Sequence, residues 1–355
     1  MDKMKLMRTE DAVGQVLCHD ITQIIKGVTK DAVFRKGHII TEEDIPVLLS
    51  VGKDHIYIWE NNENMLHEND AAEVLCSMCK GEHMERSQAK EGKIELSAAC
   101  DGLLKVDNKG LKAVNGFGQM MIATRHGNFA VKKGDKLAGT RIIPLVIEEE
   151  KMTRAKEAAM AATGNKPILN LLPFKHKKVG IVTTGNEVFY GRIKDTFTPV
   201  IEGKMAEFDT EIIDHVTWND DDKKVTASIL DMIHKGADIV VCTGGMSVDP
   251  DDKTPLAIKN TGADIVSYGA PVLPGAMFML AYYQVTDGEN PRTVAIMGLP
   301  GCVMYAKRTI FDLVLPRVMA DDKVTEEELA ALGMGGLCLN CPVCTFPNCG
   351  FGKGV

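Results

Sequence analysis

The chain has 355 residues, 45% of them hydrophobic and 25% charged, which predicts two or three globular domains and excludes a disordered or collagen-like chain. The net charge of −8 argues against non-specific nucleic-acid binding through a large basic surface. No apolar run approaches the roughly 20 residues that span a bilayer, and the amino terminus lacks a signal-peptide core, so we expect a cytoplasmic protein without membrane contact.

Residues 1–60 predict a small mixed unit of α+β type. Short runs rich in β-branched residues predict strands, and a helix lies between the last two of them. Thr41, with Asp44 three residues later, resembles a helix amino-terminal cap, and Gly52 marks the end of that helix.

Residues 61–150 predict a β-rich domain. A helix is expected over 67–80, and it contains Cys76 and Cys79, which suit a buried core and a ligand pair equally well. Alternating strands follow, with the sequence from Asp107 to Gly110 as a turn between two of them. No catalytic constellation is visible in this stretch.

Residues 151–175 are expected to form a helical linker, and residues 176–320 an α/β domain. A helix pattern over 148–162 precedes the prolines of the linker. After it, apolar strands ending in glycine alternate with helices, and the last expected helix runs from Cys302 to about Met319. This alternation predicts a three-layer fold, with a mostly parallel sheet between helices on both faces.

Three glycine loops follow three of these strands. In open α/β sheets the ligand lies outside the carboxyl ends of the strands, where glycine allows the backbone to approach a phosphate closely. One such loop carries little information, but three at one sheet edge predict a binding site. The loops are Thr183-Thr184-Gly185, Thr243-Gly244-Gly245 and Leu299-Pro300-Gly301.

Acidic residues stand beside the same loops. The helix dipole explains Asp220, Asp221 and Asp222 as well as a site does. It explains less easily the run from Asp249 to Asp252, Asp251 included, directly after a phosphate-type loop. Clustered carboxylates beside a phosphate site suggest a hard cation, for which we expect Mg²⁺.

The motifs in these loops resemble those of a known family. TTGNE, TGGMSVDPDDKTP, a separate Pro274-Gly275 and GLPG are similar to the molybdopterin-binding domain of the MoeA/MogA family, to which gephyrin also belongs. The resemblance covers 176–320, and residues 1–60 also look like the start of MoeA-type proteins. It implies binding of molybdopterin or its adenylylated form, and, for MoeA-type members, insertion of molybdate with hydrolysis of the adenylyl link.

The resemblance also implies roles for individual residues. The catalytic acids would be Glu187, Asp220 or Asp221, and Asp252. The cofactor would be bound by Thr183, Thr184, Gly185, Thr243, Gly244, Gly245, Ser247, Asp249, Thr254, Pro300 and Gly301. The chain departs from the family pattern at Asn186 and Cys302, and a cysteine-rich tail replaces the usual carboxy-terminal β domain.

Residues 321–355 are expected to form this tail as a discrete metal module, isolated from the α/β domain by glycines. Thr325 and Glu328 predict a capping box on a short helix. The spacing C-x₂-C-x₂-C-x₄-C then matches the ligand count of a [4Fe–4S] cluster, which we favour, or of a Cys₄ zinc site. The expected metal ligands are Cys338, Cys341, Cys344 and Cys349.

The leading functional prediction is a molybdopterin molybdenumtransferase that uses Mg²⁺ and acts as a homo-oligomer. Its partners would be molybdopterin or adenylyl-molybdopterin and molybdate, with no nucleic acid. Two alternatives stay open. One is a non-catalytic molybdopterin carrier or sensor with a metal-bearing tail, and the other is a nucleotide pyrophosphate hydrolase built on the same domain.

Overall fold

The computed structural model describes residues 4–25, 29–59, 64–247, 249, 252–286 and 291–354. Contacts divide the chain into two compact units. The first comprises Met1–Ser97, Val106–Arg125 and Lys136–Asn170, and the second comprises Ala98–Lys105, His126–Asp135 and Leu171–Val355. The middle of the chain therefore contributes residues to both units, and the domain boundaries expected from the sequence stay predictions.

In its described residues, the first unit combines small antiparallel sheets with four α-helices. β1 pairs with β4, β2 with β3 and β12 with β5, while β6, β7, β11 and β9 form a four-stranded sheet in that order. Its elements are β1 (Met4–Arg8), η1 (Thr9–Asp11), β2 (Ile21–Ile25), β3 (Thr29–Phe34), α1 (Asp44–Ser50), β4 (His55–Trp59), β5 (Met65–His67), α2 (Glu68–Cys79), β6 (Met84–Arg86), β7 (Lys93–Ala98), α3 (Asn108–Asn115), β9 (Met120–Thr124), β11 (Lys136–Ile142), β12 (Val146–Glu148) and α4 (Glu149–Thr163).

The helix of the amino-terminal segment begins later than the sequence predicts. Its first residue is Asp44, and the Thr41 side chain does not cap it. Instead, the N–H and the hydroxyl of Thr41 each donate to the Asp44 carboxylate at 2.9 Å. The helix ends before Gly52, which has a φ of +78°, as expected for a glycine that terminates a helix.

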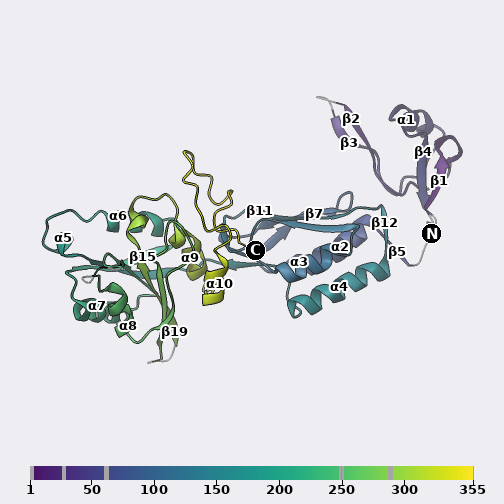
Figure 1. The fold of residues 1–355 in the computed structure, drawn as a ribbon. Helices are drawn as coiled ribbons and strands as arrows, with labels where there is room; N and C mark the ends of the chain where they lie inside the picture. The colour runs from purple at the N-terminus through teal and green to yellow at the C-terminus, as the bar shows by residue number, and fades with distance from the viewer. Residues whose placement is uncertain are drawn as a thin grey trace. The chain divides into compact units, whose positions relative to one another are not determined.

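The helices of the first unit correct one expectation and confirm another. The predicted turn from Asp107 to Gly110 is wrong, because residues 108–115 form the helix α3. The Asp107 carboxylate caps the start of this helix by accepting from the Gly110 N–H at 2.8 Å. α2 and α4 lie where helices were expected (Figure 1). Cys76 and Cys79 of α2 are both buried in its core face.

The second unit contains a six-stranded sheet in the order β15-β14-β16-β19-β18-β17. The pairs β14–β15, β14–β16 and β16–β19 are parallel, and β18 runs antiparallel to both of its neighbours. A second, three-stranded sheet has the order β10-β8-β13. The elements are β8 (Gly102–Val106), β10 (Phe129–Val131), β13 (Leu169–Pro173), β14 (Lys177–Thr184), α5 (Asn186–Phe189), α6 (Phe197–Met205), β15 (Thr210–Trp218), α7 (Asp222–His234), β16 (Ile239–Thr243), α8 (Thr254–Asn260), β17 (Asp264–Tyr268), β18 (Met279–Val285), β19 (Arg292–Leu299), η2 (Gly301–Met304), α9 (Ile310–Met319) and α10 (Glu326–Ala331).

Helices cover both faces of the six-stranded sheet. On one face, side chains of β14, α6, α9 and α10 form one hydrophobic cluster, in which Ile181, Ile201 and Phe311 are fully buried. On the other face, α7 and α8 pack through Ile229 and Ile258 (Figure 1). The expected three-layer, mostly parallel α/β fold is therefore confirmed. Among the described residues, no helix has the length and apolar character needed to cross a membrane.

The helix expected from Cys302 to Met319 is interrupted. A short 3₁₀ helix, η2, comes first, and α9 begins only at Ile310. The reason is a capping box at Thr309 that starts α9. The Thr309 hydroxyl accepts from the Phe311 N–H at 3.2 Å, and the Asp312 carboxylate accepts from the Thr309 N–H at 2.7 Å. Residues 305–309 are therefore a loop with its own side-chain contacts.

The cysteine-rich tail packs on the α/β domain, so the expectation of an isolated module is wrong. Leu329 and Phe351 belong to the core cluster of the sheet, with exposed fractions of 2% and 4%. The backbone of Leu273 bonds to both sides of Leu337, donating to Gly336 and accepting from Cys338, each at 2.8 Å. The predicted capping box of Thr325 and Glu328 is confirmed at the start of α10.

Candidate functional site

Four buried threonines tie together the elements that end or begin at the carboxyl edge of the sheet. Thr183 of β14 lies opposite Thr243 of β16, and the Thr243 hydroxyl donates to Thr183 Oγ1 at 3.3 Å. The hydroxyls of Thr184 and of Thr254, at the start of α8, lie 3.0 Å apart. Thr254 also donates to the carbonyl of Gly244 at 2.9 Å. The predicted TTG and TGG loops therefore form one hydrogen-bonded unit.

The glycines of the TGG loop are required by the packing of the loop itself. Gly244 and Gly245 have φ values of +83° and +54°, in the left-handed region that favours glycine. A Cβ on Gly244 would lie 2.0 Å from the backbone oxygen of Thr184, and one on Gly245 would lie 2.9 Å from the Thr254 hydroxyl. The loop thus packs directly on the end of β14.

The loop after β19 begins beside the TGG loop but leaves open space. Thr243 lies opposite Leu299 in the parallel register, so the residues after these two positions start side by side. Pro300 is buried, whereas Gly301 is exposed, and a Cβ there would meet no atom within 4 Å. Gly301 is therefore a position where a ligand can approach the backbone without displacing protein atoms.

A cluster that the sequence did not reveal extends this network toward β15. The Nε2 atom of His215 lies 3.1 Å from the hydroxyl oxygen of Thr183 and 3.2 Å from that of Thr198. The Thr198 hydroxyl donates to Asp195 at 2.5 Å. Burial raises the pKa of Asp195, but hydrogen bonds from Thr198 and from backbone N–H groups outweigh burial and lower that pKa below its ordinary value.

The acids assigned from the resemblance lie in separate local environments. Glu187 is exposed in α5, next to Gly185. The Asp221 carboxylate caps α7 by accepting from two backbone N–H groups, of Lys223 and Lys224, at 3.1 and 3.2 Å. The structure gives Asp221 this structural task, and Asp220 precedes it after β15.

The acids after the TGG loop are closer to it. The Asp252 carboxylate accepts from the Ser247 N–H at 3.0 Å, and the hydroxyl of Tyr268 donates to the carbonyl of Met246 at 3.0 Å. Asp249 is exposed, and Asp251 lies outside the described residues. Mg²⁺ that is bound mainly by substrate phosphates needs one or two carboxylates, which Asp249 and Asp252 could supply.

No preformed metal site is present in the part of the chain that the structure describes. There, no three His, Cys, Asp or Glu side chains gather closely enough to hold one ion. The magnesium site and the tail metal site therefore stay predictions. All four tail cysteines are free thiols, and they line one cavity together with residues of the loop before α9.

Comparison with known families identifies the domain that carries the threonine network. Residues 180–320 match the model of a family described as "Probable molybdopterin binding domain". The α/β domain of this chain thus matches a molybdopterin-binding family over residues 180–320. Residues 6–60 match a family described as a domain of unknown function, so the resemblance of this segment to MoeA-type proteins gains no functional support.

Individual relatives match shorter stretches. A CinA-like protein of Mycobacterium tuberculosis is 32% identical over 77 residues, which are 22% of this chain and 18% of the relative. A CinA-like protein of Syntrophus aciditrophicus is 39% identical over 83 residues, 23% of this chain and 19% of the relative. The matches thus span less than a fifth of these relatives.

Among solved structures, the tungsten cofactor synthesizing protein MoaB of Pyrococcus furiosus is similar at 20% identity. The similarity covers 41% of this chain and 89% of MoaB, with a TM-score of 0.31.

Proposed function

We propose that the carboxyl edge of the six-stranded sheet binds molybdopterin or its adenylylated form, and that the chain inserts molybdate as a molybdopterin molybdenumtransferase. One observation carries the proposal. The loops that begin at Thr183, Thr243 and Pro300 meet at one edge of a domain of the molybdopterin-binding family. This edge is where ligands bind in open α/β sheets.

The proposal gives each loop a task. The backbone around Gly244 and Gly301 would hold the phosphate and the pterin. At Gly301 a Cβ would meet no atom within 4 Å, so a ligand can approach the main chain there. Asp249 and Asp252 would hold Mg²⁺, which neutralises phosphate charge when it is bound. Glu187 would orient molybdate. Asp220 and Asp221 keep a place in the proposal, although Asp221 also caps α7.

One competing function has an observation in its favour. Part of the chain matches CinA-like proteins. The resemblance of this domain to proteins of that kind would imply hydrolysis of a nucleotide pyrophosphate instead. A carrier or sensor that binds molybdopterin without chemistry is the other alternative. Homo-oligomerisation stays a prediction under all three functions.

A single-turnover assay separates these functions. Excess protein is mixed anaerobically with adenylylated molybdopterin and Mg²⁺, with and without molybdate. The proposal expects release of adenosine monophosphate that depends on molybdate, together with formation of molybdenum cofactor. Release that ignores molybdate favours a pyrophosphate hydrolase, and binding without release favours a carrier.

The variant Asp252→Asn tests the assigned acid in the same assay. The asparagine oxygen can still accept from the Ser247 N–H, so the loop should survive while the charge that helps hold Mg²⁺ is lost. We expect binding of the cofactor to persist and release to fall at least about tenfold, or ~1.4 kcal/mol in the barrier. The matched control is Asp231→Asn, at an exposed side chain of α7. Equal rates in all three proteins would remove Asp252 from the site.

A further inference from the structure

The four cysteines of the tail border a single cavity of about 400 Å³. The cavity has the size of a small-molecule site, far larger than one metal ion. Its other walls include the aromatic rings of Tyr305 and Phe346 and the cations Lys307 and Arg308. The four thiols line the same cavity, which indicates a common occupant.

Tertiary contacts hold the thiols in place. The segment from Gly335 to Gly352 is closed by a hydrogen bond from the Gly352 N–H to the Gly335 carbonyl at 2.9 Å. Phe351 is buried in the core of the domain, and Phe346 packs against Phe129, with ring centroids 5.7 Å apart. These contacts anchor the segment that carries the cysteines to the α/β domain.

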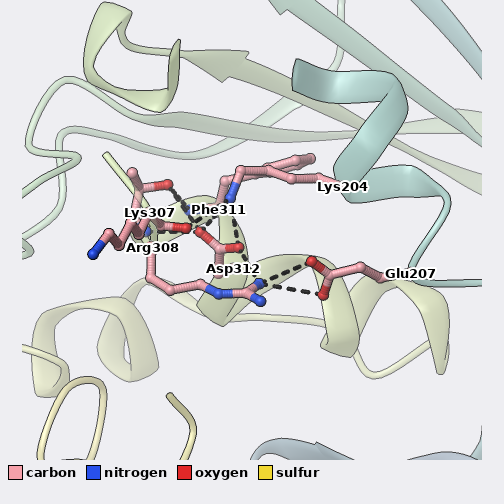
Figure 2. A network of polar contacts seen from close by, with 7 residues as sticks. Lys204, Glu207, Lys307, Arg308, Phe311 and Asp312 are labelled. Carbon is pink, nitrogen blue, oxygen red and sulfur yellow. Dashed lines mark hydrogen bonds and ion pairs between the residues drawn. The ribbon is translucent and has the colours of Figure 1, made fainter. Parts of the chain in front are cut away.

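The positive wall of the cavity is also anchored. Arg308 donates to Glu207 at 3.2 Å and to Asp312 at 2.8 Å. Lys204 donates to the same Asp312 carboxylate at 2.7 Å (Figure 2). The guanidinium of Arg308 lies 5.1 Å from the ring centre of Phe346 in the tail. This network fixes the loop before α9 against the tail.

Lys307 contacts the cysteine loop directly. Its ammonium group donates to the carbonyls of Cys341 and Pro342 at 3.3 and 2.8 Å. Among the described residues, no ion pair of Lys307 with a carboxylate is found, whereas the neighbouring Arg308 pairs with Glu207 and Asp312. Its charge therefore stays available to balance negative charge in the cavity.

We propose that this cavity binds a [4Fe–4S] cluster through Cys338, Cys341, Cys344 and Cys349. Each thiol would lose its proton and ligate one iron as a thiolate. Four thiolates give the bound cluster a net negative charge, which Lys307 and Arg308 would offset. A tetrahedral zinc site instead draws four sulfurs to about 2.3 Å from one ion. Among the described residues no three cysteines lie close enough to hold one ion, and the four thiols line a cavity of about 400 Å³, so a polynuclear group suits them better than a single zinc ion.

The test uses the full-length chain, purified anaerobically and reconstituted with iron and sulfide. We expect close to four irons and four sulfides per chain, as the composition of the cluster demands, and an absorption band at roughly 400 nm. Reduction with dithionite should produce an electron paramagnetic resonance signal. Less than about one iron per chain after reconstitution, or retention of one zinc in place of iron, overturns the proposal.

Single substitutions locate the ligands. Cys341→Ser and Cys344→Ser should each lower the iron content, or change the resonance signal where serine still ligates. Both positions are exposed, so these variants should fold, which circular dichroism checks. Cys100→Ser is the matched control, a free thiol in the same unit that does not line the cavity. Equal iron loss in the control, or unchanged iron and signal in both tail variants, contradicts the assignment.

Discussion

The carboxylate of Asp312 is buried between two cations, and its removal should be costly. Only 4% of its side chain is exposed, and it accepts from Lys204 at 2.7 and 2.9 Å and from Arg308 at 2.8 Å (Figure 2). Asp312→Ala leaves Lys204 buried without a counter-ion. We expect a loss of about 3–5 kcal/mol in the free energy of unfolding, measured with urea.

Glu207→Gln is the control for that measurement. Glu207 pairs with Arg308 from the solvent side, with 47% of its side chain exposed, and its removal should cost less than about 1 kcal/mol. Similar losses in both variants would mean that burial does not set the strength of this network.

Asp195 should make stability depend on acid pH. Its carboxylate accepts from the Phe197 and Thr198 N–H groups at 2.8 and 3.1 Å and so caps α6. Because its folded pKa is below the ordinary value of 3.8, its contribution is present above that pH and is lost as pH falls through the folded value.

Asp195→Ala should therefore cost about 1–2 kcal/mol at neutral pH, and the difference from wild type should shrink below about pH 4. Urea unfolding over a pH series measures both. A difference that stays constant down to about pH 3 would show that the Asp195 carboxylate is not stabilised in its charged form.

At the scale of the loops, the two glycine positions of the site should behave differently. Gly244→Ala would force a Cβ against the Thr184 carbonyl and impose a left-handed φ on alanine. We expect a loss of at least about 1–3 kcal/mol of stability. A valine at Gly244 would be a poor probe of binding for the same reason. Unchanged thermal unfolding of Gly244→Ala would show that this loop is not packed as described.

An element could be predicted from the sequence when the contacts that determine it lie close to it along the chain. The buried strands β14, β16 and β19 are continuous apolar runs, and α10 has its capping box in sequence, so local signals suffice. α3 looked like a turn because Asp107 and Gly110 are turn residues. In the structure Gly110 instead lets α3 approach α4, where a Cβ would lie 2.4 Å from Thr163. That partner lies more than fifty residues away.

In the candidate site, too, the features with local sequence signals were predictable and those set by distant contacts were not. The glycine loops were predictable because the carboxyl ends of parallel strands meet at one edge. His215 was not, because its contacts to Thr183 and Thr198 depend on the register of β15 against β14. The break before α9 had a local signal, since Thr309 and Asp312 have capping-box spacing.

At the scale of the whole molecule, the tail should be part of the folding unit. Phe351 is 4% exposed within the core cluster of the α/β domain. Phe351→Ala should cost about 3–5 kcal/mol of stability, measured by urea unfolding under reducing conditions. Val343→Ala in the same tail, where the side chain is 77% exposed, should change stability by less than about 0.5 kcal/mol. If both substitutions changed stability by equally small amounts, the tail would not be part of the folding unit.

The central claim is that molybdopterin binds at the carboxyl edge of the six-stranded sheet, and Gly301 tests it most directly. Gly301→Val places a side chain in space that no protein atom occupies, so the fold should be unaffected. Gly139→Val in β11, where a Cβ also meets no atom within 4 Å, is the control. Anaerobic calorimetric titration with molybdopterin should show binding by wild type and the control, and binding at least about tenfold weaker in Gly301→Val, or ~1.4 kcal/mol. Equal affinity in all three proteins, with unchanged unfolding temperatures, would contradict the account.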